Sequence, residues 1–232
     1  MTEGHESQSF YRRSRLLRPA LSFVVAVFLA PYLLTILYSF INPVSTLMLW
    51  REATGQRVQR IYLPLERAGP LLPLMVIVAE DGRFCSHFGV DFQELQQIVE
   101  EADDLKRMRG GSSITQQVAK NLFLWPGRSY LRKALEFPLA LWIDLVLSKR
   151  RIMEIYLNIA EWGPNGEFGA EAGARRAFGK PARQLGAFEA AALAAMLPDP
   201  AHRNPSNVRR LGAIYAARAA AAAWQADCLK RR

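Results

Sequence analysis

The sequence predicts a mainly α-helical fold with one core, preceded by a single apolar helix near the N-terminus. Apolar residues recur with helical spacing in successive segments after Gly111, and the chain contains no convincing run of alternating strand residues. Residues 19–50 contain no charged side chain. The 232 residues are enough for one soluble domain together with such an apolar helix.

Residues 19–41 are predicted to form a transmembrane anchor. Their length suits a helix that crosses a hydrocarbon core of roughly 30 Å, and the kink expected at Pro31 is tolerated in such helices. The alternatives are a buried core helix, which is rarely apolar on all sides for so long, and a cleaved signal peptide, whose apolar stretch is usually shorter. Positive residues before the span place residues 1–18 in the cytoplasm and the remainder outside; they are Arg12, Arg13, Arg15 and Arg18.

The formal net charge is +9 and the sequence pI is about 9.9. A basic surface suits nucleic acid, an anionic membrane face or a phosphorylated substrate. The chain has no zinc-finger spacing, no RNA-recognition signature and no long block of lysine and arginine. Nucleic acid is therefore not an expected partner.

The two cysteines, Cys85 and Cys228, lie far apart in the sequence and form no CxxC motif. This spacing favours neither a disulfide framework nor a zinc site. Both cysteines are therefore predicted to be unpaired.

The segments after the anchor predict a linker at 42–64 and a helical domain at 65–232. Asn42-Pro43 interrupts the helical pattern, and the charged residues 100–109, followed by two glycines, predict a mobile loop. Helical periodicity then predicts five helices, which cover Ser112–Phe123, Tyr130–Ser148, Arg150–Glu161, Phe188–Met196 and Leu211–Ala223. Pro138 is a candidate kink or break in the second of them.

The first segment with chemical potential is EDGRFCSHFGVD, which begins at Glu80 after a long apolar run. An acid in that position is partly desolvated, which raises the carboxyl pKa and makes the carboxylate a better base near neutral pH. The alternative is a solvated acid pair in the last turn of a helix. His87 is predicted to be a structural hydrogen-bonding residue.

The second segment, GGSSITQQVAKNLF at 110–123, predicts a helix start that attracts anions. Ser113 and Gln116 have the spacing of a capping box, and free backbone N–H groups at a helix start favour negative charge. Gln117, Lys120 and Asn121 share one helical face, which can hold a pyrophosphate. The alternative is an ordinary capped helix with a polar face. The segment lacks P-loop spacing, which argues against nucleotide binding.

The third segment places Arg132 and Lys133 one helical turn before Glu136. In a binding site these cations would keep Glu136 ionised, whereas on the surface the same residues would form an ion pair worth less than about 1 kcal/mol.

The fourth segment, KRRIMEIYLNIAEWG at 149–163, contains an apolar helical stripe that predicts a core contact rather than a lipid groove. The stripe consists of Ile152, Ile155, Tyr156 and Ile159. Asn158 is expected to face inward and to connect neighbouring elements.

In their order along the chain, these segments and the later AAALAAMLPDP resemble the five motifs of the family 51 glycosyltransferases, which polymerise peptidoglycan. The resemblance covers about residues 65–210, and a single anchor without a second domain resembles the monofunctional, biosynthetic members. It implies a lysozyme-like helical domain with a membrane-facing lobe. The sequence departs from the usual pattern at Ser113, where Thr is common, and at Leu135, where some relatives have Lys.

The resemblance also implies roles for individual residues. Glu80 would be the general base, and Glu136 the second catalytic acid. The implied substrate-binding residues are Asp81, Ser112, Thr115, Gln117, Lys120, Asn121, Arg128, Arg132 and Lys133. The resemblance leaves open whether Glu136 holds Mg²⁺ or another divalent cation, and it implies no organic cofactor.

The implied reaction joins lipid II to a growing glycan strand through a β-1,4 link, with inversion and release of undecaprenyl diphosphate. The implied location is the bacterial inner membrane, with a single span, a cytoplasmic N-terminus and a periplasmic domain. Cell-wall synthesis or division proteins remain open as partners. The alternatives are a muramidase, which needs no diphosphate pocket, and a non-catalytic membrane scaffold, which would not need to retain both Glu80 and Glu136.

Overall fold

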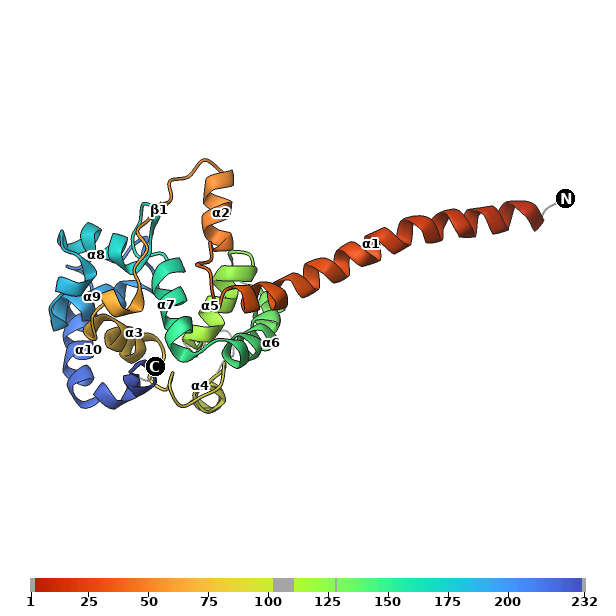
Figure 1. Cartoon of the computed structure of the whole chain (residues 1–232). Coiled ribbons are helices and arrows are strands. Elements are labelled where there is room, and N and C mark those ends of the chain that lie inside the picture. Colours follow the sequence, from red (N-terminus) through yellow and green to blue (C-terminus); the bar gives the residue numbers. More distant parts are fainter. Residues whose placement is uncertain (1–2, 102–110, 128, 231–232) are drawn as a thin grey trace.

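The computed structural model describes residues 3–101, 111–127 and 129–230, and it is mainly helical, as predicted. Helix α1 extends away from the rest of the molecule (Figure 1). The helices are α1 Glu3–Leu37, α2 Thr46–Ala53, α3 Leu71–Glu80, α4 Phe92–Glu101, α5 Ile114–Phe123, α6 Tyr130–Val146, α7 Lys149–Ile159, α8 Ala170–Phe178, α9 Ala187–Met196 and α10 Arg209–Ala221. Short 3₁₀ helices are η1 Leu65–Arg67, η3 Ala182–Gln184 and η4 Ala223–Leu229, and the strands are β1 Gln59–Arg60 and β2 Glu167–Phe168.

The core is built around α9, whose residues from Ala190 to Met196 are all buried. Their mostly small side chains let α3 and α10 pack closely against this helix. Gly212 of α10 lies so near α9 that a Cβ atom there would be 3.1 Å from the Cα of Ala192. This close packing fixes α3, which carries Glu80 as its last residue.

Helix α5 begins as the sequence predicts. The Ser113 hydroxyl accepts a hydrogen bond from the Gln116 backbone N–H at 3.1 Å, and the Gln116 side chain accepts one from the Ser113 N–H at 3.0 Å. The predicted capping box is therefore present. Helix α6 continues through Pro138 to Val146 without a break. Of the predicted loop at 100–109, Glu100 and Glu101 end α4, and residues 102–109 lie outside the described residues.

The segment at 42–64, for which the sequence predicts a linker, contains α2 and β1 and contributes to the core. Met48 of α2 is 1% exposed, and the Thr46 hydroxyl donates to the Leu124 carbonyl at 2.6 Å. Strand β1 pairs in parallel with β2, so that Gln59 lies opposite Glu167. These contacts join residues about a hundred positions apart, which local patterns do not reveal.

The C-terminal end of α1 packs on the domain, where α1 meets α6. The Trp142 indole N–H donates to the Tyr32 carbonyl at 3.0 Å, and the Tyr38 ring stacks on Phe123 with 5.9 Å between centroids. In the part of the chain that the structure describes, no helix combines the length and the hydropathy that a membrane span needs.

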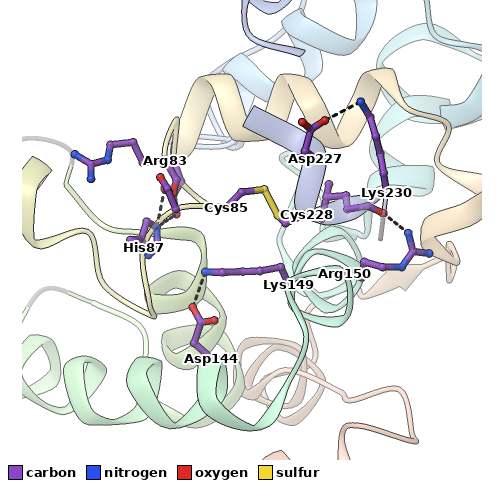
Figure 2. Close-up of a disulfide and its surroundings, with 12 residues drawn as sticks. Arg83, Cys85, His87, Asp144, Lys149, Arg150, Asp227, Cys228 and Lys230 are labelled. Carbon is purple, nitrogen blue, oxygen red and sulfur yellow. Dashed lines mark hydrogen bonds and ion pairs between the residues drawn. A yellow bond between two sulfur atoms is a disulfide. The ribbon is translucent and has the colours of Figure 1, made fainter. Parts of the chain in front are cut away.

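The prediction that the cysteines are unpaired is wrong, because Cys85 and Cys228 form a disulfide (Figure 2). Their Cα atoms are 5.5 Å apart although 143 positions separate them in the sequence. The fold brings η4 against α3 and α7, and Arg150 of α7 donates to the Leu229 carbonyl beside the disulfide. Sequence spacing carries no information about such a long-range approach. The disulfide therefore ties η4 to the loop that follows Glu80.

Reduction of this disulfide is expected to destabilise the domain by about 2–4 kcal/mol, because a cross-link over a long loop restricts the unfolded chain. Urea unfolding followed by circular dichroism, with and without a phosphine reductant, measures the change. A variant with Cys85→Ser and Cys228→Ser is the control, since its midpoint should not respond to the reductant. An unchanged midpoint for the reduced wild-type protein would contradict the prediction.

Candidate active site

Glu80 is the last residue of α3. The preceding residues of that helix are largely buried, so Glu80 lies at the edge of the apolar core. Burial is the main cause that raises the pKa of the Glu80 carboxyl, and the charge of Asp81 adds to it. The Gln117 hydrogen bond and the charges of Lys120 and Arg203 oppose this shift. The apolar run before Glu80 predicts that this carboxyl is desolvated and has a raised pKa. Such a carboxyl is suited to act as a general base.

Gln117 connects Glu80 to α5 and α7. Its amide Nε2 donates to the Glu80 carboxylate Oε2 at 2.9 Å and approaches the Ser112 carbonyl at 3.4 Å. Its amide oxygen Oε1 accepts a hydrogen bond from the Tyr156 hydroxyl at 3.1 Å. The predicted residues Glu80 and Gln117 are thus brought into direct contact.

A cluster of cations surrounds Glu136, which is only 2% exposed. Arg132 forms an ion pair with one carboxylate oxygen, and Lys133 pairs with the other at 3.0 Å. The Lys133 ammonium also donates to the Ser112 hydroxyl at 2.6 Å. Glu136 is therefore held between two positive charges, as the helical spacing of these residues predicts.

Lys120 is close enough to both Glu80 and this cluster for their charges to act on it. Burial is the main cause that lowers the pKa of Lys120, and the charges of Arg132 and Lys133 act in the same direction. The carboxylates of Glu136 and Glu80 oppose the shift, because they stabilise the ammonium. The negative groups of the site thus help to keep this desolvated lysine charged.

A cavity of about 380 Å³ opens beside these cations. Lys120, Asn121 and Arg132 line it together with Thr46, Leu47, Leu124, Trp125, Pro126 and Gly127. Leu124 and Trp125 also line an apolar cavity of about 350 Å³, whose remaining walls come from α1, α5 and α6. Chemically, the two adjoining cavities suit an anionic group that is attached to an apolar chain.

Two predicted substrate-binding residues are placed inside the protein instead. The buried Asp81 carboxylate accepts a hydrogen bond from the Ile114 N–H and bonds to the His87 ring, each at 2.9 Å. The buried Thr115 hydroxyl faces Asp144 at 3.4 Å. As predicted, His87 is a structural hydrogen-bonding residue. Arg128 lies outside the described residues.

Glu136, which the sequence analysis leaves open as a metal ligand, forms ion pairs through both of its oxygens, with Arg132 and with Lys133. In the described part of the chain, the potential ligands that lie within reach of one another are Asp81, His87 and Asp91. His87 bonds to Asp81, and Arg83 approaches Asp91 at 3.3 Å. By contrast, His87 Nδ1 and Asp91 Oδ2 have no hydrogen-bond partner among the described residues.

The sequence analysis does not assign three further residues to the site region. Tyr156 contacts Gln117, the charge of Arg203 acts on Glu80, and Asp144 accepts from the Gly89 N–H and from Lys149. A signal existed for Tyr156, because a tyrosine hydroxyl inside an apolar stripe needs a partner. The positions of Arg203 and Asp144 follow from tertiary packing alone.

Comparison with known proteins adds to this geometry, since residues 48–225 match the protein family described as "Transglycosylase". The chain belongs to the transglycosylase family. The match includes the predicted site residues from Glu80 to Glu136, and it begins within α2, which agrees with the packing of that helix on the domain.

Similar transglycosylases occur in several bacteria, each named "Biosynthetic peptidoglycan transglycosylase". The protein of Rhodopseudomonas palustris (strain TIE-1) is 58% identical over 215 residues, which is 91% of each chain. The protein of Brucella suis biovar 1 is 51% identical over 217 residues, or 91% of this chain and 96% of its own. That of Agrobacterium fabrum is 47% identical over 212 residues, or 89% and 93%.

Proposed function

We propose that this transglycosylase polymerises lipid II into the glycan strands of peptidoglycan, with Glu80 as the general base. One observation carries the proposal: α5 connects the base to the cationic cavity. Gln117 bonds to Glu80, and Lys120, one turn later on the same helix, lines the cavity together with Arg132. A base beside a cradle for an anionic leaving group suits glycosyl transfer from a diphosphate-linked sugar.

In the proposed reaction, Glu80 takes the proton from the 4-hydroxyl of the acceptor GlcNAc. The oxygen attacks the anomeric carbon of the donor MurNAc from the opposite side of the leaving group, so the configuration inverts. As the new β-1,4 bond forms, the bond to undecaprenyl diphosphate breaks and its electron pair leaves with the diphosphate. Lys120, Arg132 and Lys133 would neutralise this charge, as positioned cations do in phosphate sites.

The adjoining apolar cavity supports a lipid-linked donor. Trp125 and Leu124 form a wall common to both cavities, so a diphosphate beside Lys120 would have its apolar chain directed between α1 and α6. Glu136, paired with Arg132 and Lys133, would orient these cations toward the diphosphate.

We also propose that residues 19–41 anchor the chain in the inner membrane, with residues 1–18 in the cytoplasm and the domain that follows the anchor in the periplasm. The charge-free sequence supports this location, as do apolar side chains such as Leu21 and Phe23, which are 66% and 70% exposed on α1. The disulfide fits an oxidising compartment. An alkaline carbonate wash tests the anchor, since recovery of the full chain in the supernatant would contradict it.

Incubation of the detergent-solubilised full chain with labelled lipid II is expected to give a ladder of glycan strands on a gel. A parallel reaction with purified cell wall separates the alternatives. Release of soluble muropeptides from the wall, without polymerisation of lipid II, would identify a muramidase and overturn the proposal. The absence of both reactions would leave only a non-catalytic role.

A further inference from the structure

The Tyr156 hydroxyl is a polar group in an otherwise apolar helical face. The residue is 1% exposed, and its hydroxyl bonds to the Gln117 amide oxygen at 3.1 Å. Burial, and then the nearby charges of Glu80 and Asp81, raise the pKa of Tyr156 well above its ordinary value. The hydroxyl therefore stays protonated and remains a hydrogen-bond donor across the working pH range.

The Glu80 carboxylate can only accept a hydrogen bond, so it selects the Nε2 end of the Gln117 amide, and the Tyr156 hydroxyl donates to the Oε1 end and holds it in place. The oxygen and nitrogen ends of a glutamine side chain are nearly equal in size, so hydrogen-bond partners decide the orientation. With Oε1 held by Tyr156, Nε2 faces the Glu80 carboxylate at 2.9 Å. In the reversed orientation, the amide oxygen would face an ionised carboxylate, which is electrostatically unfavourable.

The hydrogen bond from Gln117 reaches Glu80 at Oε2. Among the residues that the structure describes, no hydrogen bond reaches Oε1, so this second oxygen is available to a substrate hydroxyl. The bond also favours the ionised form of Glu80, which is the form that accepts a proton.

We propose that Tyr156 is a positioning residue for the base, which holds the Gln117 amide so that it directs and stabilises the Glu80 carboxylate. This inference rests on the proposed function of Glu80, but the arrangement of the three side chains exists independently of it. Tyr156 itself touches no reacting atom in this scheme and acts only through Gln117.

Tyr156→Phe is expected to lower kcat/KM for lipid II roughly three- to tenfold at acidic pH, with the deficit shrinking as the pH rises. The sign follows from the charges around Glu80. When the Gln117 amide is no longer held as a donor to Glu80, its lowering effect on the Glu80 pKa is lost. Burial and the charge of Asp81 then raise this pKa further, and the charges of Lys120 and Arg203 still oppose the rise. A base with a higher pKa needs a higher pH to be ionised, so the acid limb of the pH profile moves upward.

A double-mutant comparison isolates the path through Gln117. Adding Tyr156→Phe to Gln117→Met should change kcat/KM less than twofold, because no amide remains to be oriented. Tyr215→Phe, at a tyrosine of α10, is the matched control and should leave the pH profile unchanged. Full additivity of the two substitutions, or an acid limb that does not move in Tyr156→Phe, would overturn the inference.

An observation without turnover separates this inference from the proposed function. The pKa of Glu80, followed by NMR of ¹³C-glutamate-labelled full-length protein and assigned with Glu80→Gln, should rise in Tyr156→Phe. A protein that fails to polymerise lipid II but shows this rise would remove the proposed function and keep the positioning role. An unchanged pKa would remove the positioning role, whatever the enzyme polymerises.

Discussion

Glu80→Gln is expected to lower the rate of lipid II polymerisation by about a thousandfold, which lies in the middle of the range for a lost general base. The amide has the size of the carboxylate and can still accept the hydrogen bond from Gln117, but it cannot take up the substrate proton. The gel assay with labelled lipid II measures the change. Near-normal turnover would remove Glu80 as the base.

The same substitution has an informative effect on stability. Burial raises the pKa of Glu80 above its ordinary value of 4.5, so the folded protein binds the proton more tightly than the unfolded chain. The ionised carboxylate therefore costs stability, and this cost grows as the pH rises from about 4.5 through the folded pKa and persists above it. Glu80→Gln should accordingly melt at the same or a higher temperature at neutral pH.

Glu66→Gln is the matched control for both measurements. Its side chain is 67% exposed and pairs with Arg150 on the surface, so both activity and melting temperature should stay close to those of the wild-type protein. A lower melting temperature for Glu80→Gln than for Glu66→Gln would show that lost activity reflects damage to the fold.

Lys120→Met is expected to lower kcat about a hundredfold. The methionine fills the space of the lysine stem but carries no charge to balance the departing diphosphate. Because that negative charge grows as the bond to the sugar breaks, kcat should fall more than KM rises. Steady-state kinetics with lipid II separate the two constants.

Lys180→Met supplies the comparison, since Lys180 lies on the surface and pairs with Glu189. Its kinetics should match those of the wild-type protein. If Lys120→Met also kept wild-type kinetics, the cationic cavity would have no part in the departure of the diphosphate. A rise in KM alone would assign Lys120 to ground-state binding.

The sequence predicts helices best where local chemistry decides them. Ser113 and Gln116 specify the start of α5 by their own side-chain hydrogen bonds, and the structure has both. The helical pattern predicts Phe188–Met196, and α9 covers Ala187–Met196. Asn158, predicted to face inward, bonds to both the N–H and the carbonyl of Leu63.

The features that the sequence does not predict depend on residues distant in the chain. Strands β1 and β2 have two residues each, too few for a period to be visible, and they exist because they pair with each other. The apolar stripe at 152–159 correctly predicts that Tyr156 is buried, but its partner Gln117 comes from another helix. Thr115 has the right residue type for substrate binding, yet α5 turns it toward Asp144.

The covalent link between Cys85 and Cys228 imposes an order on the maturation of the enzyme. The two residues are 143 positions apart, so the loop after Glu80 cannot be locked until the later part of the chain has been synthesised and has met an oxidant. Protein recovered from a reducing cytosol and protein recovered from an oxidising compartment are thus distinct samples. Kinetic constants of different variants become comparable only when the thiol state of each preparation has been established.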